Sequence, residues 1–325
     1  MSKPDRAEQI LAAKERGSRG RRFLSYELGG LQREWANTRD KDGCVPDFYV
    51  IRAVTLLEVF TRRNVAELID HSSQFADRAI ELSKNFKMDF SLVQSVQGRV
   101  ITLGDIVGHN VPLNSFGQIV AHFEILLGKP LRPLLSSAVD RWATEMEKRP
   151  SEPIIPDFDG VASRLVCMFE VRNILCHELP KKPAYATNEI DDFLDAAFRF
   201  TKAMEEVLTF ERFGLVPLTQ TEMNIAAGDS LRKAEAEMNH LLSEAQLHAK
   251  KFDDAYPSHS GDSWLGSLNN AQEKWLACRN ALCDFETYLN QGGTIRPLLW
   301  AIEAERLTKV RIDDLHSWLE REREK

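Results

Sequence analysis

The chain has 325 residues, 43% hydrophobic and 28% charged, a composition that is typical of a globular protein and excludes disordered and collagen-like chains. Its length predicts two domains, and its formal net charge of −7 excludes a protein that coats nucleic acid through bulk charge. The sequence has neither the apolar run of a secretory signal nor the roughly 18 to 20 uncharged residues of a membrane span, so we expect a cytoplasmic protein with no membrane partner.

We predict that residues 1–45 form a polar arm. A polar helix and a second short helix, which ends near Trp35, flank a break at residues 17–22 that is rich in Gly, Ser and Arg. The clustered arginines suit either contact with RNA or a solvated surface, and we favour the solvated surface.

Residues 46–213 predict a domain built only of helices. Apolar residues recur there at spacings of three and four, which indicates helices with one buried face. The two clearest stripes are Val50, Val54, Leu57, Val65 and Leu68, and then Phe116, Ile119, Val120, Phe123 and Leu127. Residues 85–112 contain three glycines and predict two short helices joined by a turn.

Three prolines, Pro150, Pro153 and Pro156, disfavour helix before residue 160. A helix is then expected over residues 161–179, followed by another over about 188–212. Residues 213–217 predict a linker, so we expect the domain boundary there.

The helix expected over residues 161–179 has an arginine on its apolar face. The spacing places Val161, Leu165, Met168, Leu175 and Leu179 on that face, with Arg172 in its middle. Glu170, Asn173 and His177, at offsets of three and four, share a second, polar face. Each of these residues has a structural explanation: a salt bridge between Arg172 and Glu58, and a favourable position for His177 at the C-terminal end of a helix.

The combination Arg172-Asn173-x-x-x-His177 resembles the signature of the HEPN superfamily, in which an arginine, a polar residue and a histidine follow one another in this spacing. The resemblance covers about residues 46–212 and includes an acidic residue on an earlier helix, here Glu58. It implies a HEPN-type helical bundle that cleaves RNA without metal or cofactor. The implied catalytic residues are Arg172, Asn173 and His177, with Glu58 and Glu170 in support.

The chemistry of these side chains suits cleavage in which the ribose 2′-hydroxyl attacks its own phosphate. An imidazole titrates near neutral pH and can transfer the protons, and a guanidinium can stabilise the phosphorane. Arg172 and His177 are five residues apart, about 140° around a helix, so they need not meet within one subunit. Because HEPN domains pair their motif helices, the resemblance implies a homodimer as well as an RNA substrate.

Residues 214–325 predict a second, smaller helical bundle. Helices are expected over about 219–255 and 267–290 and, after the turn at Gly292 and Gly293, to Trp318. The succession Ala271-Gln-Glu-Lys-Trp-Leu-Ala-Cys-Arg-Asn-Ala-Leu-Cys283, Gly292-Gly-Thr-Ile295 and Leu307-Thr-Lys-Val-Arg311 resembles the lysozyme inhibitor LprI-like family over about residues 217–319. Read as a plain bundle, the same segment has Trp275, Leu282 and Leu298 in its core and Arg279 in an ion pair.

The cysteines distinguish this chain from the exported members of that family. Five cysteines without a C-x-x-C pair disfavour a zinc site and suit a reducing compartment. Cys283 is in place, whereas Ala226 and a position near Glu303 stand where the resemblance implies further cysteines. We therefore expect a sensing or binding module that recognises a protein or a small ligand.

The sequence thus predicts an all-α protein, and the leading hypothesis is a HEPN-type endoribonuclease, a toxin or an anti-phage effector, with a C-terminal regulatory domain. The first alternative is a catalytically inactive binding protein, and the second is a binding protein of the lysozyme-inhibitor type.

Overall fold

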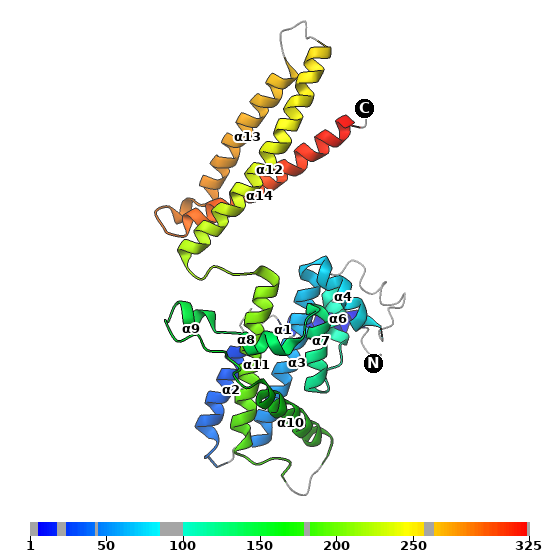
Figure 1. The fold of residues 1–325 in the computed structure, drawn as a ribbon, viewed down its shortest axis with the longest axis vertical. Coiled ribbons are helices and arrows are strands. Elements are labelled where there is room, and N and C mark those ends of the chain that lie inside the picture. The colour runs from blue at the N-terminus through cyan, green and yellow to red at the C-terminus, as the bar shows by residue number, and fades with distance from the viewer. Residues whose placement is uncertain are drawn as a thin grey trace. The chain divides into compact units, whose positions relative to one another are not determined.

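The computed structural model describes residues 6–17, 24–42, 45–84, 100–178, 183–256 and 263–323. The fold is all-α, as predicted, and the described residues form no strand, only an isolated bridge between Val139 and Pro153 (Figure 1). No helix in these residues has both the length and the apolar character that crossing a membrane requires. The turn predicted within residues 85–112 lies largely outside the described residues, which resume before a single helix, α6 (Leu103–Asn110).

The chain divides into two compact units, Met1–Val216 and Pro217–Lys325, three residues beyond the expected boundary. The helices of the first unit are α1 (Arg6–Gly17), α2 (Leu24–Thr38), α3 (Pro46–His71), α4 (Ser73–Ser83), α6, α7 (Phe116–Leu127), α8 (Leu131–Ser137), α9 (Arg141–Glu145), α10 (Phe158–His177) and α11 (Glu189–Phe213). Those of the second are α12 (Gln220–Ala255), α13 (Trp264–Glu286), the short 3-10 helix η1 (Tyr288–Asn290) and α14 (Arg296–Arg323).

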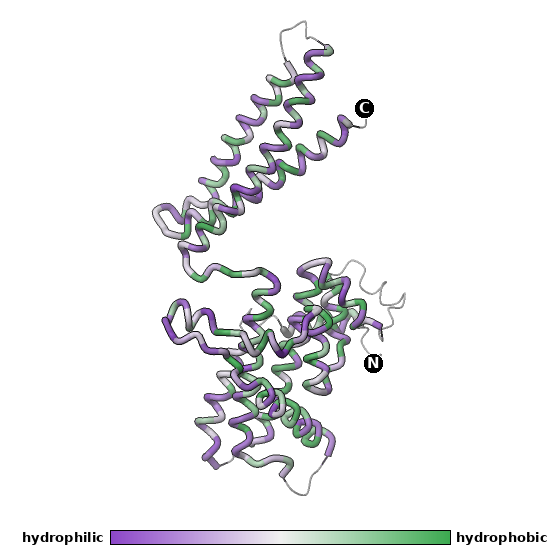
Figure 2. Tube along the Cα trace, in the orientation of Figure 1, coloured by the Kyte–Doolittle hydropathy of each residue, from purple (hydrophilic) through white to green (hydrophobic). Residues whose placement is uncertain are grey.

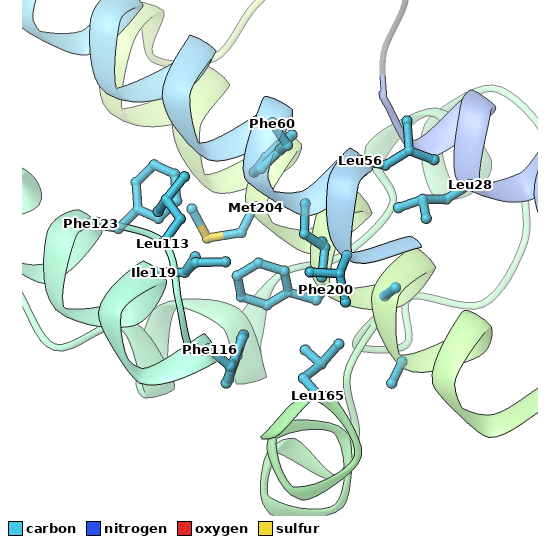
Figure 3. Packing of buried hydrophobic residues seen from close by; sticks show 14 of the residues in the cluster. Leu28, Leu56, Phe60, Leu113, Phe116, Ile119, Phe123, Leu165, Phe200 and Met204 are labelled. Atoms are coloured by element: carbon cyan, nitrogen blue, oxygen red, sulfur yellow. The ribbon is translucent and has the colours of Figure 1, made fainter. Parts of the chain in front are cut away.

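Helix α3 is the central helix of the first unit and packs against α2, α6, α7, α10 and α11. It begins with Pro46 at its first turn, where a missing N–H costs nothing. The stripe predicted from Val50 to Leu68 is fully buried, and so is the second stripe apart from the half-buried Val120. Figure 3 shows side chains from several helices meeting in this core, among them Phe60, Phe123 and Phe200.

The prediction of a separate polar arm over residues 1–45 is wrong for α2. Leu28, Leu31 and Trp35 are buried in the same core as α3, and Leu28 is visible there in Figure 3. These residues lie at offsets of three and four and form one apolar face. The stripe is short and follows the arginine-rich break at residues 17–22, so the sequence of this segment gives little sign of its burial.

Helix α1 is attached to the first unit by an ion pair at the start of α6. Lys14 Nζ lies 2.6 Å from Asp105 Oδ2, and Asp105 also closes a capping box with Thr102. Burial raises the pKa of Asp105, but the hydrogen bonds from Lys14 and Thr102 outweigh it, and the pKa is lowered from its ordinary value.

A carboxyl group whose pKa is lowered by folding stabilises the fold above its unfolded pKa, and this stabilisation is lost as the pH falls through the folded pKa. We therefore expect Asp105→Asn to lower the melting temperature most near neutral pH. The difference from the unsubstituted protein should shrink below about pH 4, the ordinary pKa of aspartate. Melting curves of both proteins across this range provide the measurement, and a pH-independent difference would contradict the role of the Asp105 charge.

The second unit consists of three long amphipathic helices. Figure 2 shows hydrophilic and hydrophobic residues alternating along α12, α13 and α14. Thr219 and Glu222 form a capping box that begins α12. The helices bury a core around Met238, Leu241 and Leu315 and a second one around Cys283 and Ala304. The three predicted helices are present. The second, predicted to reach residue 290, ends at Glu286, and η1 follows it.

Candidate functional site

Helix α10 carries the predicted catalytic residues on two different faces. Asp157 caps its first turn by accepting a hydrogen bond from the Gly160 N–H, and the helix ends at His177, after which the backbone is extended. The predicted apolar face is buried at Val161, Leu165 and Met168. Leu175 is half-buried against the same core, and Leu179 lies outside the described residues.

The side chain of Arg172, on α10, points toward α3 and pairs there with Glu58. Its Nη2 donates to Glu58 Oε1 at 2.5 Å, and the two side chains are 16% and 24% exposed. The guanidinium also lies 5.8 Å from the centre of the Phe169 ring. A second cation, Arg62, lies one turn after Glu58, with its Nη1 3.9 Å from Glu58 Oε2. One carboxylate is therefore shared by two arginines, which leaves a net positive charge.

The remaining predicted residues lie on the outer face of α10. Glu170 and His177 are exposed, and Asn173 is half-buried with its Nδ2 3.5 Å from the Asn114 backbone oxygen. Among the described residues, His177 makes no hydrogen bond or ion pair. Its imidazole is therefore accessible to a substrate or to a second protein.

The structure brings Glu58 and Arg172 together and keeps His177 apart from them. Because α10 is continuous from Arg172 to His177, five residues turn their side chains about 140° from each other. Two neighbours of the motif, Arg62 and Asn114, were not singled out in the sequence. The spacing of four between Glu58 and Arg62 is a signal that identifies the first, whereas no sequence pattern links Asn114 to Asn173.

In the second unit, the residues that carry the family resemblance form one polar and aromatic network. Arg279 is 6% exposed, and its Nη1 donates to Glu235 Oε1 at 2.8 Å and to Thr308 Oγ1 at 3.0 Å. Arg279 and Arg311 lie 5.5 and 5.8 Å from the centre of the Trp275 ring. Glu235 is on α12, Trp275 and Arg279 are on α13, and Thr308 and Arg311 are on α14, so this network joins all three helices.

The ion pair of Arg279 and the core positions of Trp275 and Leu298 agree with the bundle interpretation. Leu282 does not, because its side chain is 42% exposed. It lies on the outer face of α13, one residue before the buried Cys283, and adjacent helical residues point about 100° apart.

Cys283 occupies the centre of the second apolar cluster of this unit as a free thiol. It is fully buried beside small residues, Ala227, Ala301 and Ala304. Burial, followed by the nearby Glu303 charge, raises the pKa of the Cys283 thiol, which makes the thiolate scarce.

Comparison with known proteins supports the assignment of the second unit. The model of the family described as "Lysozyme inhibitor LprI" matches residues 217–315. The chain is also similar to the protein named "Uncharacterized protein R02472" from Rhizobium meliloti (strain 1021), with 27% identity over 107 residues, which are 32% of this chain and 76% of that protein. No HEPN family match is found, and no solved structure matches the chain significantly. Residues 217–315 thus form an LprI-like domain, which confirms the resemblance inferred from the sequence of this segment.

Proposed function

We propose that the first unit is a metal-independent endoribonuclease of the HEPN type that acts as a homodimer, in a toxin or an anti-phage effector. In this proposal the LprI-like domain recognises a protein or small ligand and regulates the nuclease. The observation that carries the proposal is the arrangement on α10: the Arg172 guanidinium is held through one nitrogen, Nη2, by Glu58, and the same helix ends at His177, whose side chain is exposed.

The surroundings of Arg172 suit the binding of a phosphate. Only its Nη2 donates to Glu58, so the other donors of the guanidinium have no partner among the described residues. Arg62 adds a second positive charge beside Glu58. A fixed guanidinium with spare donors binds phosphate oxygens in paired hydrogen bonds and stabilises the extra charge of a phosphorane.

The proposed reaction is an attack of the ribose 2′-hydroxyl on the adjacent phosphate of the RNA. A neutral imidazole of His177 accepts the proton of the 2′-hydroxyl while O2′ forms a bond to phosphorus. The bond from phosphorus to O5′ breaks, and O5′ takes a proton from an imidazolium or from water. The products are a 2′,3′-cyclic phosphate and a free 5′-hydroxyl, and Asn173 and Glu170 lie on the same face of α10 as His177.

In a homodimer, a second copy of the chain can bring together Arg172 and His177, which point in different directions within one subunit. Since Arg172 and His177 diverge by about 140°, a paired α10 would bring the histidine of one subunit toward the arginine of the other. Val166 on α10 is 44% exposed. It lies eleven residues before His177, about 20° around the helix, so a second copy that covers His177 would also cover Val166.

Two other functions have specific support. A non-catalytic binding protein is favoured by the ion pair itself, which neutralises Arg172 without any substrate, and by the position of His177 at a helix C-terminus. A lysozyme-binding protein is favoured by the match of residues 217–315 to a family of lysozyme inhibitors. Lysozyme activity measured with and without the full chain tests the latter, and an unchanged activity excludes it.

The end chemistry of cleaved RNA tests the nuclease. We expect the purified full chain to cut RNA in the presence of a metal chelator and to leave 5′-hydroxyl ends that a kinase can label directly. Cleavage that needs a divalent metal, or that leaves 5′-phosphates, would contradict the proposed mechanism. Uncut RNA with a folded, dimeric protein would favour the binding protein.

A further inference from the structure

The first unit contains a cleft of about 720 Å³ between α2, α3 and α11. This volume is within the usual range for sites that bind small molecules, about 300–1,000 Å³. Its charged lining comprises Arg63, Glu67, Asp70, His71, Glu205 and Arg212, and its apolar wall comprises Leu24, Phe60, Phe213 and Val216. Glu58 and Glu67 are nine residues apart on α3, about 180° around the helix, so the cleft and the Arg172 site lie on opposite faces of α3.

Two arginines in the cleft are fixed by one carboxylate. Arg63 Nε donates to Glu67 Oε1 at 2.7 Å, and Arg212 Nη1 donates to Glu67 Oε2 at 2.6 Å. Burial raises the pKa of Glu67, but the hydrogen bonds and charges of the two arginines outweigh it and lower the pKa, so Glu67 stays ionised near neutral pH. The group of three side chains has a net positive charge and a fixed geometry.

The acidic groups of the cleft already have donors, whereas the arginines have donors to spare. Asp70 accepts from Thr102 Oγ1 at 2.5 Å and from the Gly104 N–H at 2.9 Å. Glu205 accepts from the Ser25 N–H at 3.1 Å and from its Oγ at 2.6 Å. Both Nη atoms of Arg63, and the Nη2 of Arg212, have no hydrogen bond to a described residue. The spare donors of these two arginines, in a group that is net positive with Glu67, favour a ligand that places acceptor oxygens next to them.

Beside Arg212, the cleft offers a flat apolar surface. The ring of Phe213 belongs to a side chain that is 60% exposed. Its ring is positioned by Arg212, whose guanidinium carbon lies 5.3 Å from the ring centre, and by the edge of His71 at 5.0 Å. His71 Nε2 donates to the Arg212 backbone oxygen at 2.7 Å and so fixes the end of α11.

We propose that this cleft binds a nucleoside monophosphate, with its phosphate on Arg63 and Arg212 and its base against Phe213. Three donor nitrogens match the terminal oxygens of a phosphate group, and an aromatic base has the flat face that an exposed phenyl ring stacks on. The site is independent of the proposed nuclease. Its lining includes Val216, the last residue of the first unit.

Calorimetric titration of the full chain with the four ribonucleoside 5′-monophosphates tests this site. We expect saturable binding of at least one of them, and much weaker binding of adenosine alone or of inorganic phosphate alone. The absence of binding of all four at millimolar concentration would overturn the proposal. Equal affinity for inorganic phosphate would overturn the role of Phe213, and equal affinity for adenosine would overturn that of the arginines.

A pair of matched variants assigns the binding to the cleft. Arg63 and Arg199 are both helix residues that pair with a carboxylate four positions away, and their side chains are 38% and 42% exposed. Arg63→Gln is expected to weaken binding about tenfold or more, the effect of one lost charge-assisted hydrogen bond, and Arg199→Gln is expected to leave it unchanged. Equal affinities of the two variants would contradict the assignment, and circular dichroism of both confirms that they fold.

Discussion

His177→Ala is expected to lower the rate of RNA cleavage by about 10²–10⁴-fold, the usual contribution of a general acid or base. The expected effect on folding is small because the His177 side chain is exposed and makes no hydrogen bond to another described residue. Rates measured with the purified full chain under saturating RNA, beside melting curves of the same samples, separate the two effects. A loss of stability in place of a loss of rate would indicate a structural histidine.

The control for His177→Ala is His240→Ala. His240 is also an exposed histidine on a helix, but it lies on α12 in the second unit. We expect this variant to cleave RNA at the unsubstituted rate. Equal losses in the two variants would show that the activity does not depend on the α10 motif.

Arg279→Met is expected to destabilise the LprI-like domain by about 3 kcal/mol, the lower end of the cost of breaking a buried ion pair. The lower end applies because Glu235, which would be left without its cation, is 34% exposed. Thr308 also loses a donor, and Trp275 loses one of its two cations. Methionine is shorter but has a similar volume, so little of the effect comes from lost volume. Denaturant unfolding followed by tryptophan fluorescence measures the change.

Arg306→Met provides the comparison for Arg279→Met. Arg306 pairs with Glu303 on the same helix, but its side chain is 61% exposed. Solvent screens such a pair, so little change in stability is expected. If the two variants unfold alike, the network does not hold the three helices together.

The helical class and most helix positions of this protein are predictable from the sequence because apolar residues recur at helical spacing. The stripe from Val50 to Leu68 extends over several helical turns, so its period is clear despite the charged residues between its members. All of its members are buried. The burial of α2, which the sequence predicts as a helix, is less evident because its stripe comprises only three large residues and follows an arginine-rich break. Whether so short a stripe is buried depends on the helix it packs against, here α3. The sequence of the α2 segment alone does not specify that contact.

The candidate site was predictable in its residues and less so in its geometry. The pairing of Arg172 with Glu58 follows from a charge on each of two apolar helix faces, since each charge needs a partner. The cleft around Glu67 depends on the way α3 presents different faces to α10, α6 and α11. That arrangement is a property of the packed unit, and no motif in the sequence encodes it.

The most direct test of the proposed nuclease is total RNA from bacteria in which the full chain is induced, beside cells that express the same level of His177→Ala. We predict growth arrest and RNA fragments with 5′-hydroxyl ends in the first culture and intact RNA in the second. Identical RNA in the two cultures, with both proteins present and folded, would contradict the assignment of RNA cleavage to α10.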